Sequence, residues 1–319
     1  MAATATSSAT AAMSSTSGPK EIDSAMIAGV LHAASAAADL VPTMVAQGTD
    51  AAWAALAGAP VEDLVVLGCY LAVIAGVAVE TAVHWQRPDR ASRLGEARAA
   101  GVMAAGALAV GVLCTALLRE LWVVVASVAP SAASTFWDAH PVLATVAAFV
   151  AWDLIGFCHH QIGHRTAAGW AAHRPHHTGR EYQLALGLRL SWLPWHSFAL
   201  SPLLALAGWD LHTVIVCAAV SNLLQALQHT AADVPVPRLL GAVLMTPEHH
   251  RHHHAVGGDV VNLGPVLTCW DRLAGSYRSG PIPVGTRYGL EGAGATNPMA
   301  AELDGLRTLV RRRSVAPLT

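Results

Sequence analysis

The sequence predicts an all-α protein, a polytopic integral membrane helical bundle of about four spans arranged as helical hairpins, with a cytoplasmic histidine-rich helical cap. Two observations lead to this prediction. Apolar residues make up 54% of the 319 residues and charged residues only 13%, the mean hydropathy is +0.44, and several apolar stretches approach the length that crosses a bilayer. Histidine is the unusual component, because 14 of the 17 histidines fall between His159 and His254.

The two ends of the chain differ from its middle. Residues 1–24 are rich in Ala, Ser and Thr, so we expect a disordered tail. Residues 25–60 are moderately apolar and fit either an interfacial helix or a weak membrane helix. We expect residues 61–277 to form one membrane-embedded domain, and residues 278–319 to form a C-terminal cytoplasmic tail.

The spans follow from length and from arginine placement. Residues 64–84 are apolar and cover about 30 Å as a helix, which is the thickness of the bilayer core. The loop that follows carries four arginines at 87–98, which places it in the cytoplasm by the positive-inside rule. Residues 99–118 then form a span that runs outward, and residues 141–158 form one that returns.

This order of spans brings the histidines to one face of the membrane. The span at 141–158 ends next to His159, on the same side as the arginine loop. Residues 193–227 are apolar but broken near 205–212, so they fit two shortened spans that dip into the bilayer and return to His229. All dense histidine clusters are therefore expected on the cytoplasmic face.

Three clusters and one single histidine have the spacing of metal ligands. The segment at 159–164 reads HHQIGH, in which His160 and His164, or alternatively His159 and His164, share a helix face. The segment at 173–177 reads HRPHH, and Pro175 is expected in the first turn of a helix, with His173 just before that helix. His229 stands alone.

The third cluster, at 246–254, reads TPEHHRHHH. Thr246 can cap a helix whose first residue is Pro247, with Glu248 favourable in the first turn. Two registers of the spacing His-x-x-His-His fit equally here: His249, His252 and His253, or His250, His253 and His254.

Neutral imidazole suits Fe, Zn, Cu and Ni, and eight or nine imidazoles are too many for one ion, so we expect two metals. Asp153 lies about two helical turns before His160, where it could accept a hydrogen bond from a ligand or anchor the helix end. We expect packing or interface roles for the isolated histidines, which are His32, His84, His140, His196 and His212.

Other classes of protein are less well supported. A net charge of −2 without a run of basic residues argues against a nucleic-acid partner, and five scattered cysteines argue against a disulfide framework or a cysteine zinc site. A metal transporter or store would carry its ligands near the bilayer midplane. A zinc-dependent hydrolase needs a general base, and Glu248 is the acidic residue next to a cluster.

Together these motifs resemble the fatty acid hydroxylase/sterol desaturase superfamily. The pattern runs from Asp153 through the first two clusters and Trp170 to His229, and ends on Thr-Pro-x-x-His-Arg-x-His-His at 246–254. Downstream, NLG at 262–264 and WDRLAGSY at 270–277 are similar to further family motifs. The resemblance selects His160 over His159, and His250 over His249 as the first histidine of the last motif.

The resemblance implies a membrane-bound diiron enzyme that oxidises a lipid, sterol-like or other isoprenoid substrate with O2, hydroxylation being favoured over desaturation. Electrons would come from a separate ferredoxin or reductase, because the sequence has no His-Pro-Gly-Gly haem motif. The implied metal ligands are His160, His164, His173, His176, His177, His229, His250, His253 and His254. The residues expected to support them are Asp153, Gln183, Arg189, Asp233, Asn262, Trp270 and Asp271.

The chain also departs from the family pattern. Gln161 follows the first-motif histidine where arginine is frequent, and Gln183 replaces a common asparagine. Gln225 stands where some members carry a second histidine one turn before His229. These departures bear on the substrate and on the groups around the ligands, and they leave the histidine motifs intact.

Overall fold

A computed structural model describes residues 58–193, 200–290 and 295–310, and the side chains at 112, 113, 115 and 116 lie outside the description. Every named element in these ranges is a helix, and the extended backbone pairs only in two isolated β-bridges. The predicted all-α fold is confirmed for this part of the chain. The tail at 1–24, nearly all of the segment at 25–60, and His32 and His196 lie outside the described residues.

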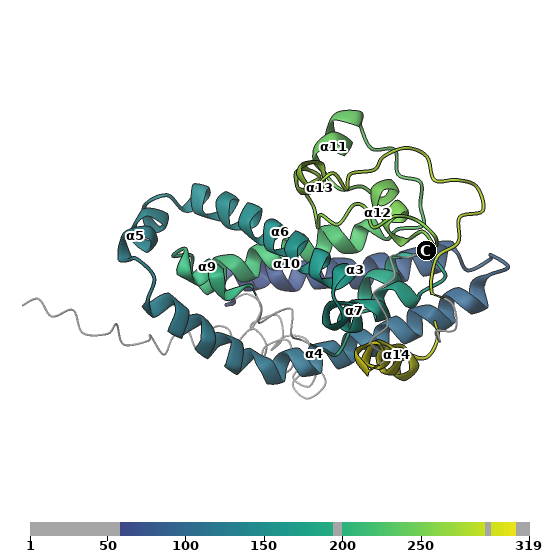
Figure 1. The fold of residues 1–319 in the computed structure, drawn as a ribbon, viewed down its shortest axis with the longest axis horizontal. Helices are drawn as coiled ribbons and strands as arrows, with labels where there is room; N and C mark the ends of the chain where they lie inside the picture. The colour runs from purple at the N-terminus through teal and green to yellow at the C-terminus, as the bar shows by residue number, and fades with distance from the viewer. Residues whose placement is uncertain (1–57, 194–199, 291–294, 311–319) are drawn as a thin grey trace, which may run out of the picture. The chain divides into compact units, whose positions relative to one another are not determined.

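Four long helices provide the apolar part of the molecule (Figure 1): α3 (Val61–Val83), α4 (Arg90–Ser127), α6 (Pro141–Arg165) and α10 (Leu211–Gln228). By length and composition, α3, α6 and α10 could each cross a membrane. A fourth span is possible where the end of α4, from Leu117, meets α5 (Ser131–Ala139) at a bend of 104°. The predicted spans at 64–84 and 141–158 correspond to α3 and α6, whereas the predicted span at 99–118 lies inside the longer helix α4.

The segment at 193–227 differs from a hairpin of two similar arms. Its described first arm contains only α9 (Pro202–Leu206), whereas its second arm is the whole of α10. Gly208 between them has φ +88°, a left-handed conformation that glycine adopts without strain. Asp210 then caps α10 by accepting a hydrogen bond from the Thr213 amide at 2.8 Å.

The helices pack around small residues and leave large apolar side chains outside. α10 packs against α3 and α6, and a buried cluster of Trp122, Leu204, Ala205 and Val214 joins α4, α9 and α10. By contrast, α3 exposes Leu71, Ile74 and Val79 by 54%, 60% and 63%. An apolar helix with large exposed side chains is typical of a surface that faces lipid.

Short helices carry the second and third histidine clusters and the segments around them: α7 (Ala167–His173), η1 (Arg174–Thr178), η2 (Leu184–Leu188), α11 (Arg238–Val243), α12 (Pro247–His254) and α13 (Cys269–Ala274). Figure 1 shows α11, α12 and α13 together on one side of α6 and α10.

The region expected to be a tail contains a packed helix. Residues of α14 (Pro298–Val310) pack against α7 and η1, and the buried Glu302 accepts hydrogen bonds from the Trp192 amide and the Ser191 hydroxyl at 3.1 and 2.9 Å. Gly305 makes the close approach possible, because a Cβ there would overlap the carbonyl of Ala171. The amphipathic spacing of apolar residues in 298–310 was the available signal in the sequence.

Replacing Gly305 with alanine tests this packing. Gly305→Ala should lower the thermal unfolding midpoint, because the new methyl group overlaps the Ala171 carbonyl oxygen. Gly101→Ala in α4 is the matched control, since a Cβ there meets nothing within 4 Å and alanine favours a helix by about 1 kcal/mol. Equal midpoints for the two variants, measured by circular dichroism in detergent, would contradict the packing of α14 on α7.

Candidate metal centre

The first histidines are placed by the end of α6. His160 and His164 share one face of α6, with ring centroids 5.1 Å apart. The chain then reverses at Thr166, whose hydroxyl accepts a hydrogen bond from the Gly169 amide at 2.9 Å and caps α7. Gly169 is needed at this reversal, because a Cβ would overlap the carbonyl of Ile162.

The reversal returns His173 to the two histidines of α6. Its ring centroid lies 4.6 Å from that of His160 and 4.7 Å from that of His164. His173 is both the last residue of α7 and the residue that precedes η1, and Pro175 lies in the first turn of η1 as predicted. α7 therefore ends just before Pro175, and the proline lies in the first turn of the helix that follows.

In two pairs of consecutive histidines, the two rings point in different directions. The rings of His176 and His177 are inclined at 86°, and those of His253 and His254 at 90°. His177 and His253 face each other with their Nε2 atoms 3.2 Å apart, while the ring of His254 lies 4.7 Å from that of His176. Each pair thus contributes one ring to each of two separate groups.

The helix α12 directs His249 and His252 away from the other histidines. Thr246 caps the helix by accepting from the His249 amide, and the His249 Nδ1 accepts in return from the Thr246 amide at 3.2 Å. The His249 Nε2 lies 3.0 Å from the Tyr277 hydroxyl, and the His252 Nε2 lies 2.7 Å from the Gly280 carbonyl oxygen. Both rings are engaged away from the other histidines.

All nine histidines implied as ligands come together in two groups, within each of which the candidate ligand atoms lie within 4.8 Å of one another. The larger group consists of His160, His164, His173, His177 and His253, and the smaller group consists of His176, His229, His250 and His254. In the described parts of the chain, no carboxylate or thiol belongs to either group.

The hydrogen bonds of the rings show that these groups fit cations. His160 Nδ1 lies 2.8 Å from the Leu263 carbonyl oxygen and His253 Nδ1 lies 2.9 Å from that of Val261, so both Nδ1 atoms carry the proton. Their Nε2 atoms are then lone pairs, and they face each other at 3.1 Å. Two lone pairs cannot bond to each other, whereas two imidazoles at right angles on one metal at about 2.1 Å would have nitrogens about 3 Å apart.

The smaller group repeats this arrangement. His229 Nδ1 donates to the Gln225 carbonyl oxygen at 2.9 Å, which leaves the His229 Nε2 as a lone pair. That atom lies 2.9 Å from the His250 Nε2 and 3.2 Å from the His176 Nε2. In the larger group, the buried His164 Nε2 has no hydrogen-bond partner among the described residues, which is costly without a ligand.

Burial keeps the imidazoles in the form that binds metal. It lowers the pKa of His229 from its ordinary value of 6.5 to about 4, and it lowers the pKa of His253 and His254 well below that ordinary value, with neighbouring histidines adding to the effect. All three rings are therefore neutral at physiological pH, and neutral imidazole is the coordinating species.

The carbonyl group that orients His160 belongs to a loop held by two carboxylates. Asp271 accepts hydrogen bonds from the Leu263 and Gly264 amides at 2.8 and 2.6 Å. Asp153 accepts from the Val266 and Leu267 amides and from the Trp270 indole, at 2.9, 3.1 and 2.8 Å. Two roles were expected for Asp153. In these contacts its carboxylate does not accept a hydrogen bond from a histidine, and it orients the loop instead.

Other expected supporting residues contact the backbone around the histidines. Arg189 is buried and donates to the Pro175 carbonyl oxygen and the Thr178 hydroxyl, which fixes η1. Asn262 has φ +52°, a left-handed conformation that asparagine tolerates, and its amide group donates to the His249 carbonyl oxygen at 2.8 Å. Gln183 donates to the Arg93 carbonyl oxygen.

Asp233 lies at the edge of the centre. It is exposed and pairs with Arg251 at 2.7 Å, and Arg251 also donates to the carbonyl oxygens of Thr230 and Ala232. The pair therefore connects α12 to the segment that follows His229.

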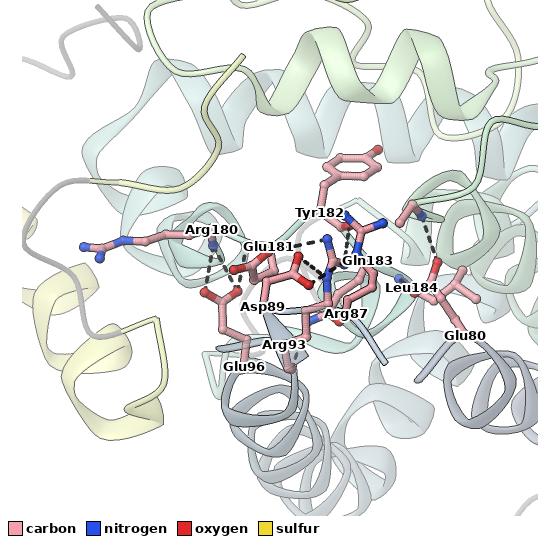
Figure 2. Close-up of polar contacts among 11 residues, drawn as sticks. Glu80, Arg87, Asp89, Arg93, Glu96, Arg180, Glu181, Tyr182, Gln183 and Leu184 are labelled. Atoms are coloured by element: carbon pink, nitrogen blue, oxygen red, sulfur yellow. Dashed lines mark hydrogen bonds and ion pairs between the residues drawn. The ribbon is translucent and has the colours of Figure 1, made fainter. Parts of the chain in front are cut away.

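Sequence reasoning missed two carboxylates that connect α3 and α4 to the centre (Figure 2). Glu80 of α3 accepts from the Leu184 amide at 2.5 Å, as Figure 2 shows. It also accepts from the Ala231 amide at 2.8 Å and from the Thr230 hydroxyl at 3.0 Å. It therefore holds the segments after the second cluster and after His229. The signal in the sequence was a single acidic residue in the apolar stretch 64–84.

Glu96 has a similar role on α4. Its buried carboxylate accepts hydrogen bonds from the Arg180 and Glu181 amides at 2.9 and 3.1 Å, as Figure 2 shows. In the same view, Arg93 contacts Asp89 at 2.9 Å and the Tyr182 carbonyl oxygen at 3.3 Å. These contacts fix the backbone between η1 and η2.

The acidic residue next to the last cluster points away from the histidines. Glu248 is exposed, and its carboxylate accepts a hydrogen bond from the Gly280 amide at 3.0 Å. This placement does not suit the general base that a zinc-dependent hydrolase needs.

The segment that carries the nine histidines is similar to known proteins. Residues 145–276 match the family model described as fatty acid hydroxylase. The family resemblance read from the motifs is thereby confirmed. No solved structure matches the chain significantly.

Similar proteins are lipid monooxygenases and hydroxylases. The chain is 29% identical to human alkylglycerol monooxygenase over 136 residues, which cover 41% of this chain and 30% of that protein. It is 31% identical to the Danio rerio alkylglycerol monooxygenase, again over 41% of this chain and 29% of that protein. It is 29% identical to ornithine lipid hydroxylase of Rhizobium tropici over 175 residues, 53% of this chain and 52% of that protein. The matched region thus spans less than a third of the monooxygenases and about half of the hydroxylase.

Glu80→Gln tests the attachment of the histidine segments to α3. The amide nitrogen of glutamine would face a backbone N–H, so the variant loses at least one hydrogen bond, which is worth about 1–2 kcal/mol. We expect a lower thermal unfolding midpoint by circular dichroism. Glu62→Gln, at an exposed position of the same helix, is the matched control and should change the midpoint little. A Glu80→Gln midpoint equal to that of the control would refute the proposed attachment.

Proposed function

We propose that this chain is an iron-dependent, O2-using lipid hydroxylase whose active centre is the pair of histidine groups. The observation that carries the proposal is the convergence of nine imidazoles in two groups. Backbone carbonyl oxygens accept the Nδ1 protons of His160, His229 and His253. The fatty acid hydroxylase domain and the lipid monooxygenase relatives support the same reading.

Each group would hold one iron ion. His160, His164, His173, His177 and His253 would bind the first, and His176, His229, His250 and His254 would bind the second. Iron bound there would supply the reduction of O2 and the oxidising power that an unactivated C–H bond requires. The net reaction converts R–H, O2, two electrons and two protons to R–OH and water, so an external donor is required, for which we propose a separate ferredoxin or reductase.

The chain's own residues keep the site dry and fixed. His177, His250, His253 and His254 are at most 6% exposed, so water has little access to these rings. The carbonyl oxygens of Leu263, Val261 and Gln225 hold single tautomers, so the lone pairs are oriented before any ligand binds. This preorganisation lowers the cost of assembling the site.

The substrate is proposed to be a polar membrane lipid that reaches the centre from the bilayer. The relatives are named for alkylglycerols and for an ornithine lipid, which differ in the polar end. Neither name points to a sterol or an isoprenoid, so these classes are less favoured. The arginines at 87–98 support a centre on the cytoplasmic face, because the positive-inside rule favours a cytoplasmic location for such a loop.

Metal analysis tests the two-iron centre and its register. The purified chain should contain about two irons, as nine imidazoles exceed the four to six ligands of one ion. His250→Ala should reduce the iron content strongly, whereas His249→Ala should retain the iron while losing its contacts with Thr246 and Tyr277. Equal iron loss in both variants would contradict the register, and a single zinc would contradict the diiron proposal.

Lipid analysis tests the reaction. Cells that produce the chain and are grown under ¹⁸O2 should accumulate a lipid that is heavier by one ¹⁸O atom, and cells that produce His250→Ala should not. A desaturated product would instead lack two hydrogens and carry no label. A lipid whose label comes from water, or a product formed without O2, would exclude the proposed oxygenation.

A further inference from the structure

Outside the long helices, one apolar surface is exposed, and no other described segment packs over it. We call it the α11–α13 surface and define it by Val234, Leu239, Leu240, Val243 and Leu273. Leu239 and Leu273 are 79% and 81% exposed, and the other three are 50–53% exposed. Five large aliphatic side chains from two short helices and the segment before them are unfavourable in water.

The position of α13 along α6 indicates what covers this surface. Asp153 in α6 contacts the Trp270 indole of α13 at 2.8 Å, and it lies seven residues before His160, which is about 10 Å along the helix. Pro265 packs so closely on Gly156 of α6 that a Cβ on this glycine would overlap its ring. The start of α13 and the preceding loop therefore lie beside the apolar part of a candidate span, rather than beyond its end.

α6 exposes an apolar row that ends at this same level. Val142, Val146, Val150 and Leu154 follow one another at intervals of four residues, and they are 78%, 57%, 38% and 39% exposed. On a helix that crosses a bilayer, such a row faces the acyl chains. Leu154 adjoins Asp153 and so brings this lipid-facing row to the level of the contact with α13.

The charges around the α11–α13 surface suit lipid headgroups. Arg238 begins α11 and Arg272 lies in α13, and both are exposed. Arg272 also lies over the Tyr277 ring and donates through Nε to the Thr268 hydroxyl at 3.3 Å. The acidic residues of the same segments are engaged elsewhere, because Asp271 is buried and accepts backbone hydrogen bonds, and Asp233 pairs with Arg251. Arginines at the edge of an apolar surface can extend to lipid phosphates while the aliphatic side chains enter the leaflet.

We propose that the α11–α13 surface is inserted in the membrane leaflet next to α6. Val234, Leu239, Leu240, Val243 and Leu273 contact the glycerol and upper acyl region of the lipids, and Arg238 and Arg272 contact the phosphates. The histidine-bearing segments are then attached to the bilayer at a second place besides the long helices. This proposal is independent of the metal and of the catalytic activity.

Site-specific photo-crosslinking in a bilayer tests the insertion. The full chain is prepared with the photo-reactive residue p-benzoylphenylalanine in place of Leu239 or of Leu273, and in place of Ser279 as an exposed control outside the surface. Each protein is reconstituted in nanodiscs of phosphatidylcholine and phosphatidylglycerol, irradiated and digested. Mass spectrometry should find the mass of one phospholipid on the peptides that contain positions 239 and 273, with at least a fivefold lower yield at 279.

The other outcomes identify other covers. An adduct between two copies of the chain at 239 or 273 would show that a second copy covers the surface, and the proposal would fail. A lipid yield at 239 and 273 equal to that at 279 would show exposure to water and would also overturn it. Both replaced leucines are highly exposed, so the substitutions should leave the fold unchanged, which the unfolding midpoint checks independently.

Discussion

The structure depends on one electrostatic constraint, the convergence of nine neutral imidazoles, six of them buried, whose lone pairs point at one another. His160 and His253 show it most directly, because each donates its Nδ1 proton to a backbone carbonyl and turns its Nε2 toward the other ring at 3.1 Å. Such an arrangement is unfavourable without a cation between the rings. The surrounding chain must therefore hold the rings against repulsion and desolvation, and much of the polar structure serves this purpose.

Carboxylates in and near the apolar helices hold the rings indirectly. Asp153 and Glu80, on α6 and α3, bind backbone N–H groups of segments that lead to or from histidines. Asp271 and Glu96 do the same from α13 and α4. A carboxylate fixes a loop, a loop carbonyl fixes the tautomer of a ring, and the ring directs its lone pair inward. A charged group in an apolar helix is costly unless it is satisfied in this way, which explains why each of the four accepts at least two hydrogen bonds.

The proposed function and the proposed insertion concern the same problem, which is how an apolar substrate meets a polar metal centre. The long helices place apolar side chains such as Val146 and Ile74 outside and the histidines at their ends. The α11–α13 surface lies beside α6 at the level of Asp153, so the loop that orients His160 would be attached both to a span and to the leaflet. Lipid packing around this loop could then influence the geometry of the centre without any direct contact with the histidines.

The sequence by itself determined the helical class, the apolar stretches, the N-cap at Thr246 and the histidine clusters, because these follow from local spacing and composition. Periodicity could not choose between His249 and His250, and the family resemblance made that choice. Only the tertiary structure showed its physical reason, which is that His249 completes the cap of α12 and contacts Tyr277. The split of His176 from His177, the roles of Glu80 and Glu96, and the packing of α14 were likewise decided by the fold. Each of these depends on contacts between residues far apart in the chain, and local spacing does not say which segments meet.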